Sequence, residues 1–262
     1  MSKDIFVFSH IPKNAGTSVT ELIRSANGLR HVDVIQRSRQ GLYQYGYNEL
    51  RSDMKLMPWA ISLAGHCIQP WQSYHEFDER MFWFVMLREP VARFISQYTY
   101  QVARYNLKED FFQWKKKYRQ DNAQVVHLAG EPDLQAAKEI LRDKIDLIGF
   151  VDSIDDSVNF LNKWLGVSSV QNNNIKKKNP SPNHLRKNII DNYHIYSEAI
   201  NECNALDLQL YDYAKDIYEK KLFDAYASLS PLGEARGAAS IINKYTSVAF
   251  RSIVYKNYTR FV

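Results

Sequence analysis

Apolar residues in this chain fall into short uninterrupted runs and into longer stretches with helical spacing. Residues 5–8 and 81–87 are uninterrupted apolar runs, and the second reads Met-Phe-Trp-Phe-Val-Met-Leu. Such runs are typical of parallel strands that are buried on both faces. Weaker runs predict three more strands, at residues 31–36, 59–64 and 147–151. The chain is therefore expected to contain a sheet with residues 81–87 as its strongest strand.

Stretches with apolar residues at every third or fourth position predict helices between and after these runs. The first begins at Thr17, and the others lie at residues 91–104, 108–143, 153–165, 187–199 and 205–226. Two segments are predicted to be loops. Residues 37–58 are polar and interrupted by Gly41 and Gly46, and residues 171–186 are rich in Asn, Lys and Pro.

The alternation of strands and helices predicts an α/β fold, a P-loop-like, three-layer domain with a central parallel sheet flanked by helices. We expect this domain to cover residues 1–228, a length that suits one domain. Residues 229–262 carry five basic residues and one acidic residue, with apolar residues at helical spacing. They predict a helical C-terminal extension that docks on the domain or on a partner subunit. Peripheral contact with an anionic membrane is the alternative.

Composition narrows the class of protein. A hydrophobic content of 45% excludes global disorder, and a formal net charge of +5 favours anionic cofactors or substrates over nucleic acid. The two cysteines, Cys67 and Cys203, are too few for a disulfide framework or a four-ligand zinc site, so no metal is expected. The N-terminus lacks a signal-peptide pattern, and no apolar run approaches the roughly 18 residues of a membrane span. We therefore expect a soluble cytoplasmic protein.

The segment between the first strand and the first helix is predicted to form an anion site. It reads His10-Ile-Pro-Lys-Asn-Ala-Gly-Thr-Ser18 and contains residues that break regular structure. Backbone N–H groups converge where a helix begins, and the helix dipole adds partial positive charge there. Lys13 adds a full charge. The Walker pattern places its Lys late in the loop, directly before the hydroxyl residue, whereas Lys13 comes early.

A second motif follows the strongest strand and reads Leu87-Arg-Glu-Pro-Val-Ala-Arg-Phe-Ile-Ser-Gln-Tyr98. Arg88 is expected at the carboxyl end of the strand, and Ser96 two turns into the next helix. Arg93, Ser96, Gln97 and Tyr100 are predicted to share one face of that helix. A guanidinium fork with a nearby hydroxyl can hold a tetrahedral anion. Ligands of parallel sheets bind at the carboxyl ends of strands, where both motifs are predicted to lie.

These two motifs, in this order, resemble those of sulfotransferases that use PAPS (3′-phosphoadenosine 5′-phosphosulfate). The chain is most similar to the branch that contains the heparan-sulfate 2-O-sulfotransferases and their bacterial relatives. The resemblance implies that Lys13 stabilises the leaving phosphate and that Arg88 and Ser96 hold the 3′-phosphate of the donor. It also implies a 5′-phosphate site built from five loop residues. These are Asn14, Ala15, Gly16, Thr17 and Ser18.

The same resemblance suggests a base and a closing loop. His66, in Ala-Gly-His-Cys at a predicted strand end, occupies the position of the family's base for the acceptor hydroxyl. Some relatives have two histidines there, and His10 is a competing candidate. In related enzymes a basic loop closes over the nucleotide. Lys178 and Ser181 are the best matches to it, and a merely solvated loop is an equal alternative. The motif around Asp207 resembles a structural helix of the family.

The resemblance implies transfer of a sulfuryl group from PAPS to a hydroxyl of a carbohydrate or glycolipid acceptor, leaving 3′,5′-ADP. Trp71, Tyr74 and the basic run at residues 115–119 are candidates for contact with that acceptor. Two other hypotheses about the function of the protein remain open. One is a P-loop kinase or NTPase, and the other is a non-catalytic module that binds polyanions or membranes.

Overall fold

The computed structural model describes residues 3–35, 45–118, 120–165 and 183–228 of the chain. One parallel sheet of five strands lies at its centre, in the order β2-β3-β1-β4-β5. The strands are β1 (Ile5–Ser9), β2 (His31–Asp33), β3 (Ser62–Gly65), β4 (Met81–Leu87) and β5 (Leu147–Phe150). The predicted α/β fold with a parallel sheet is confirmed.

The central strand β1 pairs with β3 on one side and with β4 on the other. In register, Ser9 lies opposite Gly65 of β3 and Val85 of β4. After β1 the chain builds the β2 and β3 side of the sheet, and after β4 it builds the β5 side. Connections that diverge in this way form a topological switch point, where open α/β sheets bind their ligands. The carboxyl ends of β1 and β4 are therefore the expected place for the site.

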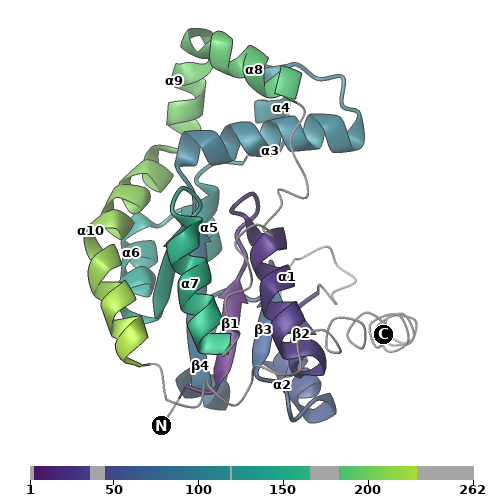
Figure 1. Cartoon of the computed structure of the whole chain (residues 1–262). Helices are drawn as coiled ribbons and strands as arrows, with labels where there is room; N and C mark the ends of the chain where they lie inside the picture. Colours follow the sequence, from purple (N-terminus) through teal and green to yellow (C-terminus); the bar gives the residue numbers. More distant parts are fainter. Residues whose placement is uncertain (1–2, 36–44, 119, 166–182, 229–262) are drawn as a thin grey trace.

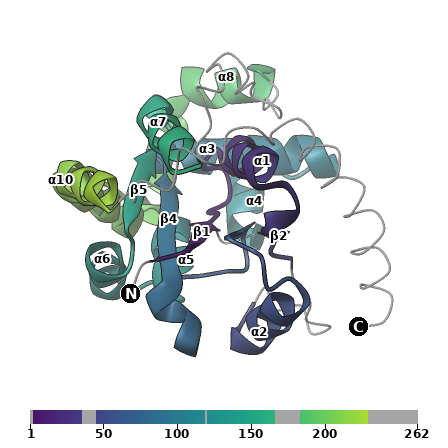
Figure 2. The ribbon, with the colours of Figure 1, turned by 60° about the horizontal axis from the view of Figure 1, so that its bottom comes forward.

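Helices cover both faces of the sheet (Figures 1 and 2). α1 (Gly16–Asn27) and α7 (Ile154–Leu165) pack on the face that Phe6 and Phe8 enter. The opposite face, which Ile5 and Val7 enter, is covered by three helices. These are α2 (Tyr47–Leu56), α5 (Ala123–Ala129) and α6 (Leu134–Asp143). Successive side chains of a strand point to opposite faces, so the apolar run of β1 supplies both cores.

Helix α10 (Ala205–Ala227) runs along the β5 edge of the sheet (Figure 1). Its first half contributes Leu210 and Ala214 to one core, and its last turn contributes Ala225 to the other. The helix thus closes the edge and joins the two layers. An exposed strand edge would otherwise offer unpaired backbone groups to another chain.

Four further helices form a cap beyond the carboxyl ends of the strands, at the top of Figure 1. They are α3 (Pro90–Tyr105), α4 (Phe111–Tyr118), α8 (Asn183–Asp191) and α9 (Tyr193–Cys203). The cap has a core of its own, in which the fully buried Trp114 packs against Phe94 and Tyr98. Pro90 and the side chain of Glu89, which accepts from two backbone amides, start α3 directly after β4.

The prediction of a loop over residues 37–58 is wrong, because α2 occupies its second half. Gly46 begins this helix instead of breaking it, and the Glu49 side chain accepts a hydrogen bond from the Gly46 backbone amide at 3.0 Å. Leu50 and Met54 then bury one face. Helix α8 likewise begins inside the segment predicted as a loop to residue 186. The extension at 229–262 lies outside the described residues.

Candidate functional site

The loop after β1 has a backbone shaped by two left-handed residues. Lys13 has φ 72° and Ala15 has φ 58°, and Ala15 is the N-cap of α1 without a side-chain cap. Left-handed residues in a turn direct successive N–H groups into one concavity that attracts anions. The first intrahelical bond runs from the Val19 amide to the Ala15 carbonyl. The amides of Ala15, Gly16 and Thr17 precede that bond, and a helix N-terminus favours negative charge.

Two residues expected to contact the donor are engaged within the loop. The Asn14 amide donates to the Ile11 carbonyl at 3.2 Å, and the Ser18 amide donates to the Ala15 carbonyl at 3.1 Å. The Asn14 side chain is fully buried and donates to the Met86 carbonyl at 2.8 Å. Asn14 therefore holds the loop against β4.

Gly16 allows the closest contact in the site. A Cβ atom at Gly16 would lie 1.5 Å from Nε2 of His10, so only glycine leaves room for the imidazole against the start of α1. The His10 ring stacks between Phe8, at 5.5 Å between centroids, and His66, at 4.0 Å. Burial lowers the pKa of His10 well below its usual value, and the nearby His66, His127 and Lys13 add to that shift. His10 is therefore neutral and packs the loop.

His66 follows β3 and is exposed to solvent. Its Nδ1 lies 2.6 Å from the carbonyl oxygen of His10, which can only accept a hydrogen bond. The proton of the neutral ring is thereby placed on Nδ1, and Nε2 is left as the basic nitrogen. Desolvation by the surrounding protein lowers the pKa of His66, although the bond to His10 opposes this shift. At neutral pH the side chain is ready to accept a proton.

Lys13 lies under the cap. Its Nζ is 3.9 Å from the centroid of the Tyr100 ring of α3, a cation–π contact. Burial, and then the neighbouring Arg88, lower the pKa of Lys13 to about 8. Ser96 is half-buried on α3, one helical turn before Tyr100, and therefore lies on the side of this helix that Lys13 contacts.

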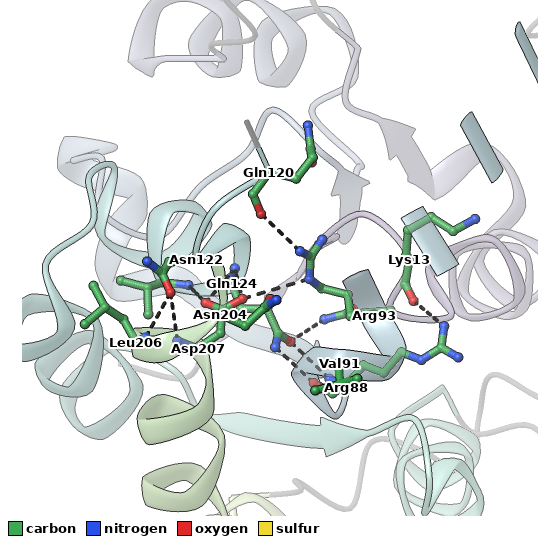
Figure 3. Close-up of polar contacts among 12 residues, drawn as sticks. Lys13, Arg88, Val91, Arg93, Gln120, Asn122, Gln124, Asn204, Leu206 and Asp207 are labelled. Atoms are coloured by element: carbon green, nitrogen blue, oxygen red, sulfur yellow. Dashed lines mark hydrogen bonds and ion pairs between the residues drawn. The ribbon is translucent and has the colours of Figure 1, made fainter. Parts of the chain in front are cut away.

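Arg88 follows β4 and reaches the loop after β1. Its Nη1 donates to the Lys13 carbonyl at 3.1 Å (Figure 3). Burial lowers the pKa of Arg88, and repulsion from Arg186 of α8 lowers it further, while Asp152 and Glu89 oppose the shift. Lys13, Arg88 and Arg186 thus gather positive charge at one place. The sequence offered no motif for Arg186, which lay at the end of a predicted loop.

Other predicted site residues lie elsewhere. Arg93 is fully buried, with its Nε 3.9 Å from Asp207, and does not share an open helix face with Ser96. Tyr74 is also fully buried, and its hydroxyl donates to the Tyr45 carbonyl, so it is not a contact surface for an acceptor. Lys178 and Ser181 lie outside the described residues.

Only some of the remaining residues that were predicted to contact the acceptor are available to a ligand. Trp71 is 38% exposed, packs on the bare Cα of Gly130, and donates from its indole to Gln69. In the basic run, Lys115 forms an ion pair with Glu202 at 2.7 Å, which reduces its attraction for an anionic ligand. Trp71 is therefore the better candidate.

Within the described parts of the chain, no group of three or more His, Cys, Asp or Glu side chains is arranged to hold a metal ion. None of the helices in those parts is both long and apolar enough to cross a membrane.

The switch point of the sheet, the helix N-terminus beside it and the basic residues around both define an α/β protein with a candidate anion site. A sequence profile described as the sulfotransferase family matches residues 2–220. The chain therefore belongs to the sulfotransferase family, whose members transfer sulfuryl groups. A search of curated proteins found no match.

Proposed function

We propose that this protein transfers a sulfuryl group from PAPS to the hydroxyl of a carbohydrate or glycolipid acceptor and releases 3′,5′-ADP. The observation that carries the proposal is the contact between two basic motifs at adjacent strand ends, where the Arg88 side chain bonds the backbone of Lys13. Two cationic centres in one site suit a nucleotide that bears an anionic group at each end. The resemblance of the two sequence motifs to those of the heparan-sulfate 2-O-sulfotransferase branch is our reason for proposing a sugar hydroxyl as acceptor.

The loop and α1 would hold the 5′ end of the donor. The amides of Ala15, Gly16 and Thr17 precede the helical ladder and are suited to the 5′-phosphate, with the hydroxyls of Thr17 and Ser18 beside them. PAPS supplies an activated sulfuryl group, whose bond to a 5′-phosphate oxygen breaks as the bond to the acceptor oxygen forms. Lys13 neutralises the negative charge that develops on that phosphate oxygen.

Arg88 and Ser96 would hold the 3′-phosphate, and Arg186 adds charge beside Arg88. A guanidinium group offers several parallel donors, so Arg88 can bond the ligand and the Lys13 carbonyl from different nitrogens. Fixing both ends of the nucleotide orients the sulfuryl group for in-line attack.

His66 would act as the base. Its Nε2 is the unprotonated nitrogen, because Nδ1 bonds the His10 carbonyl. It takes the proton of the acceptor hydroxyl as the oxygen attacks. Trp71, part-exposed in the segment after His66 and packed on Gly130, offers an aromatic face on which a sugar ring can stack.

Single-turnover transfer from labelled PAPS to a panel of sugar and glycolipid acceptors tests the proposal. Lys13→Ala and His66→Ala should each slow transfer by about 10²–10⁴-fold, the usual effect of removing a charge stabiliser or a base. Lys215→Ala on α10 and His194→Ala on α9, at exposed surface positions, are the controls and should keep normal rates. Undiminished transfer by either site variant would contradict its assigned role.

Calorimetric titration separates the proposal from a P-loop kinase or NTPase. Binding of 3′,5′-ADP without added magnesium, tighter than binding of Mg·ATP, is the expected result. Preference for Mg·ATP would favour the kinase reading, and binding of neither nucleotide would favour a non-catalytic module.

A further inference from the structure

One buried face of α5 contacts the loop after β1, the end of β1 itself and the segment after β4. Gln124, in the first turn, bonds the loop after β1 and the start of the segment after β4. His127, one turn later, lies 2.8 Å from the Ser9 hydroxyl, which itself donates to the Ile68 carbonyl. This short helix is therefore placed to set where those segments stand relative to one another.

We propose that Gln124 is a positioning residue that fixes the spacing between the two anion-binding halves of the site. This inference rests on the proposed binding of a nucleotide with 5′ and 3′ phosphates. In this role Gln124 does not contact a reacting atom. Its part is to hold the loop that bears Lys13 and the strand end that bears Arg88 at a set distance.

The side chain of Gln124 makes three hydrogen bonds across this gap. Figure 3 shows how Gln124 lies against Arg88. Its Oε1 accepts from Asn14 Nδ2 at 2.8 Å and from the Arg88 backbone amide at 3.0 Å. Its Nε2 donates to the Arg88 carbonyl at 2.9 Å. Gln124 is 1% exposed, so water does not compete for these bonds. A buried amide with its oxygen and nitrogen both engaged has a single orientation.

The backbone of Gln124 is itself anchored. The Asp207 carboxylate of α10 accepts from the amides of Gln124 and Val125, at 3.1 and 2.8 Å. In return, the Asn122 side chain accepts from the amides of Leu206 and Asp207 at the start of α10. Each helix thus caps the N-terminus of the other, and Gln124 projects from a fixed base.

Two other side-chain bonds link the two halves. Asn14 Nδ2 also donates to the Met86 carbonyl of β4 at 2.8 Å. The Arg88 guanidinium donates to the Lys13 carbonyl. That guanidinium is also the proposed ligand of the 3′-phosphate, so its direction changes with the ligand. The Gln124 bonds use the Arg88 backbone and are independent of what the side chain does. They keep the spacing while Arg88 binds.

The test measures how much the 3′-phosphate adds to the affinity of the full chain for the nucleotide. The dissociation constants of 3′,5′-ADP and 5′-AMP are measured by calorimetry, and their ratio reports what the 3′-phosphate adds. Gln124→Met keeps the length and removes all three bonds. It should reduce this ratio by about tenfold or more, with a much smaller change for 5′-AMP. Gln135→Met, which removes an exposed hydrogen bond of α6, is the matched control and should leave the ratio unchanged.

A purely structural role would lower the melting temperature and weaken both ligands in proportion, and an unchanged ratio in folded Gln124→Met would overturn the inference. If that variant fails to fold, Gln124→Asn, which keeps the amide but is one methylene too short to reach both segments, replaces it with the same expectation. A wild-type protein that does not prefer 3′,5′-ADP over 5′-AMP would instead overturn the proposed function.

Discussion

Lys13 and Ala15 hold left-handed backbone conformations on either side of Asn14. This conformation costs a residue with a side chain roughly 1–2 kcal/mol. The buried Asn14 amide, which bonds both Met86 and Gln124, supports the strained turn. The strain serves the anion site, because it is what turns the N–H groups of the loop into one concavity.

Replacing Ala15 with glycine should stabilise the protein. Glycine adopts φ 58° without strain, and this gain exceeds the added entropy of the unfolded chain, so we expect about 0.5–1 kcal/mol in the free energy of unfolding. Urea denaturation measures it. Ala26→Gly, in the last turn of α1, is the control and should destabilise by about 0.5–1 kcal/mol, because glycine has no strain to relieve there. A change of the same sign in the free energy of unfolding of the two variants would argue against strain at Ala15.

The pH dependence of kcat/KM should reflect His66 and Lys13. His66 must be neutral, so the rate should rise with pH through the pKa of His66, which lies below its ordinary 6.5. Lys13 must be protonated, so the rate should fall as the pH rises through about 8. Lys13→Arg retains its charge at higher pH and should lose the alkaline limb. An alkaline limb that persists in Lys13→Arg belongs to another group.

Among the elements, apolar runs predicted the strands well. Helix α2 was not predicted, and its start depends on a side-chain cap. Residues 81–87 form β4 residue for residue, because a strand buried on both faces has no competing pattern. Helix α2 was missed because Gly46 counted as a breaker, whereas the Glu49 side chain makes it a helix start.

Part of the site could be predicted from sequence and part could not. The positions of Lys13, Arg88 and His66 could be predicted, because each follows an apolar run that forms a strand, and the fold places all three at the carboxyl ends of strands. Gln124 was not found, because its value comes from bonds to segments distant in sequence. Arg186 was missed for the same reason, since only the fold of α8 brings it near Arg88.

The mutual capping of α5 and α10 makes Asp207 important for stability. Asp207→Ala removes the acceptor for two helix amides and leaves the buried charge of Arg93 without its partner. The loss in the free energy of unfolding should be about 3–5 kcal/mol. Asp212→Ala is the control on the same helix, because its exposed pair with Lys215 should contribute under about 1 kcal/mol. Similar urea midpoints for the two variants would contradict the proposed cap.

In the whole molecule, the site lies between the sheet and a cap with a separate core. Loop residues and Arg88 come from the sheet, whereas Ser96, Tyr100 and Arg186 belong to α3 and α8 of the cap. A ligand that contacts both should restrain both, even though their cores are distinct.

Hydrogen exchange tests this joint restraint. Binding of 3′,5′-ADP should slow exchange at the start of α1 and in α8 around Arg186, because the ligand lowers the population of open states at its contacts. Helix α6, on the far face of the sheet, provides the internal control and should be unaffected. Protection confined to α1 would show that the cap takes no part in binding.

The pairing of β1 with β4 has a consequence for selectivity. Ser9 stands opposite Val85, and from these positions the chain continues to Lys13 and to Arg88. A shift of one residue in this pairing would move one basic centre past the other by about 3.3 Å. The hydrogen bonds between β1 and β4 thus set the separation of the two basic centres that would bind the proposed ligand. An isomer with its second phosphate on the 2′ carbon has the same charge and base, but the separation of its two phosphates does not match that of the basic centres.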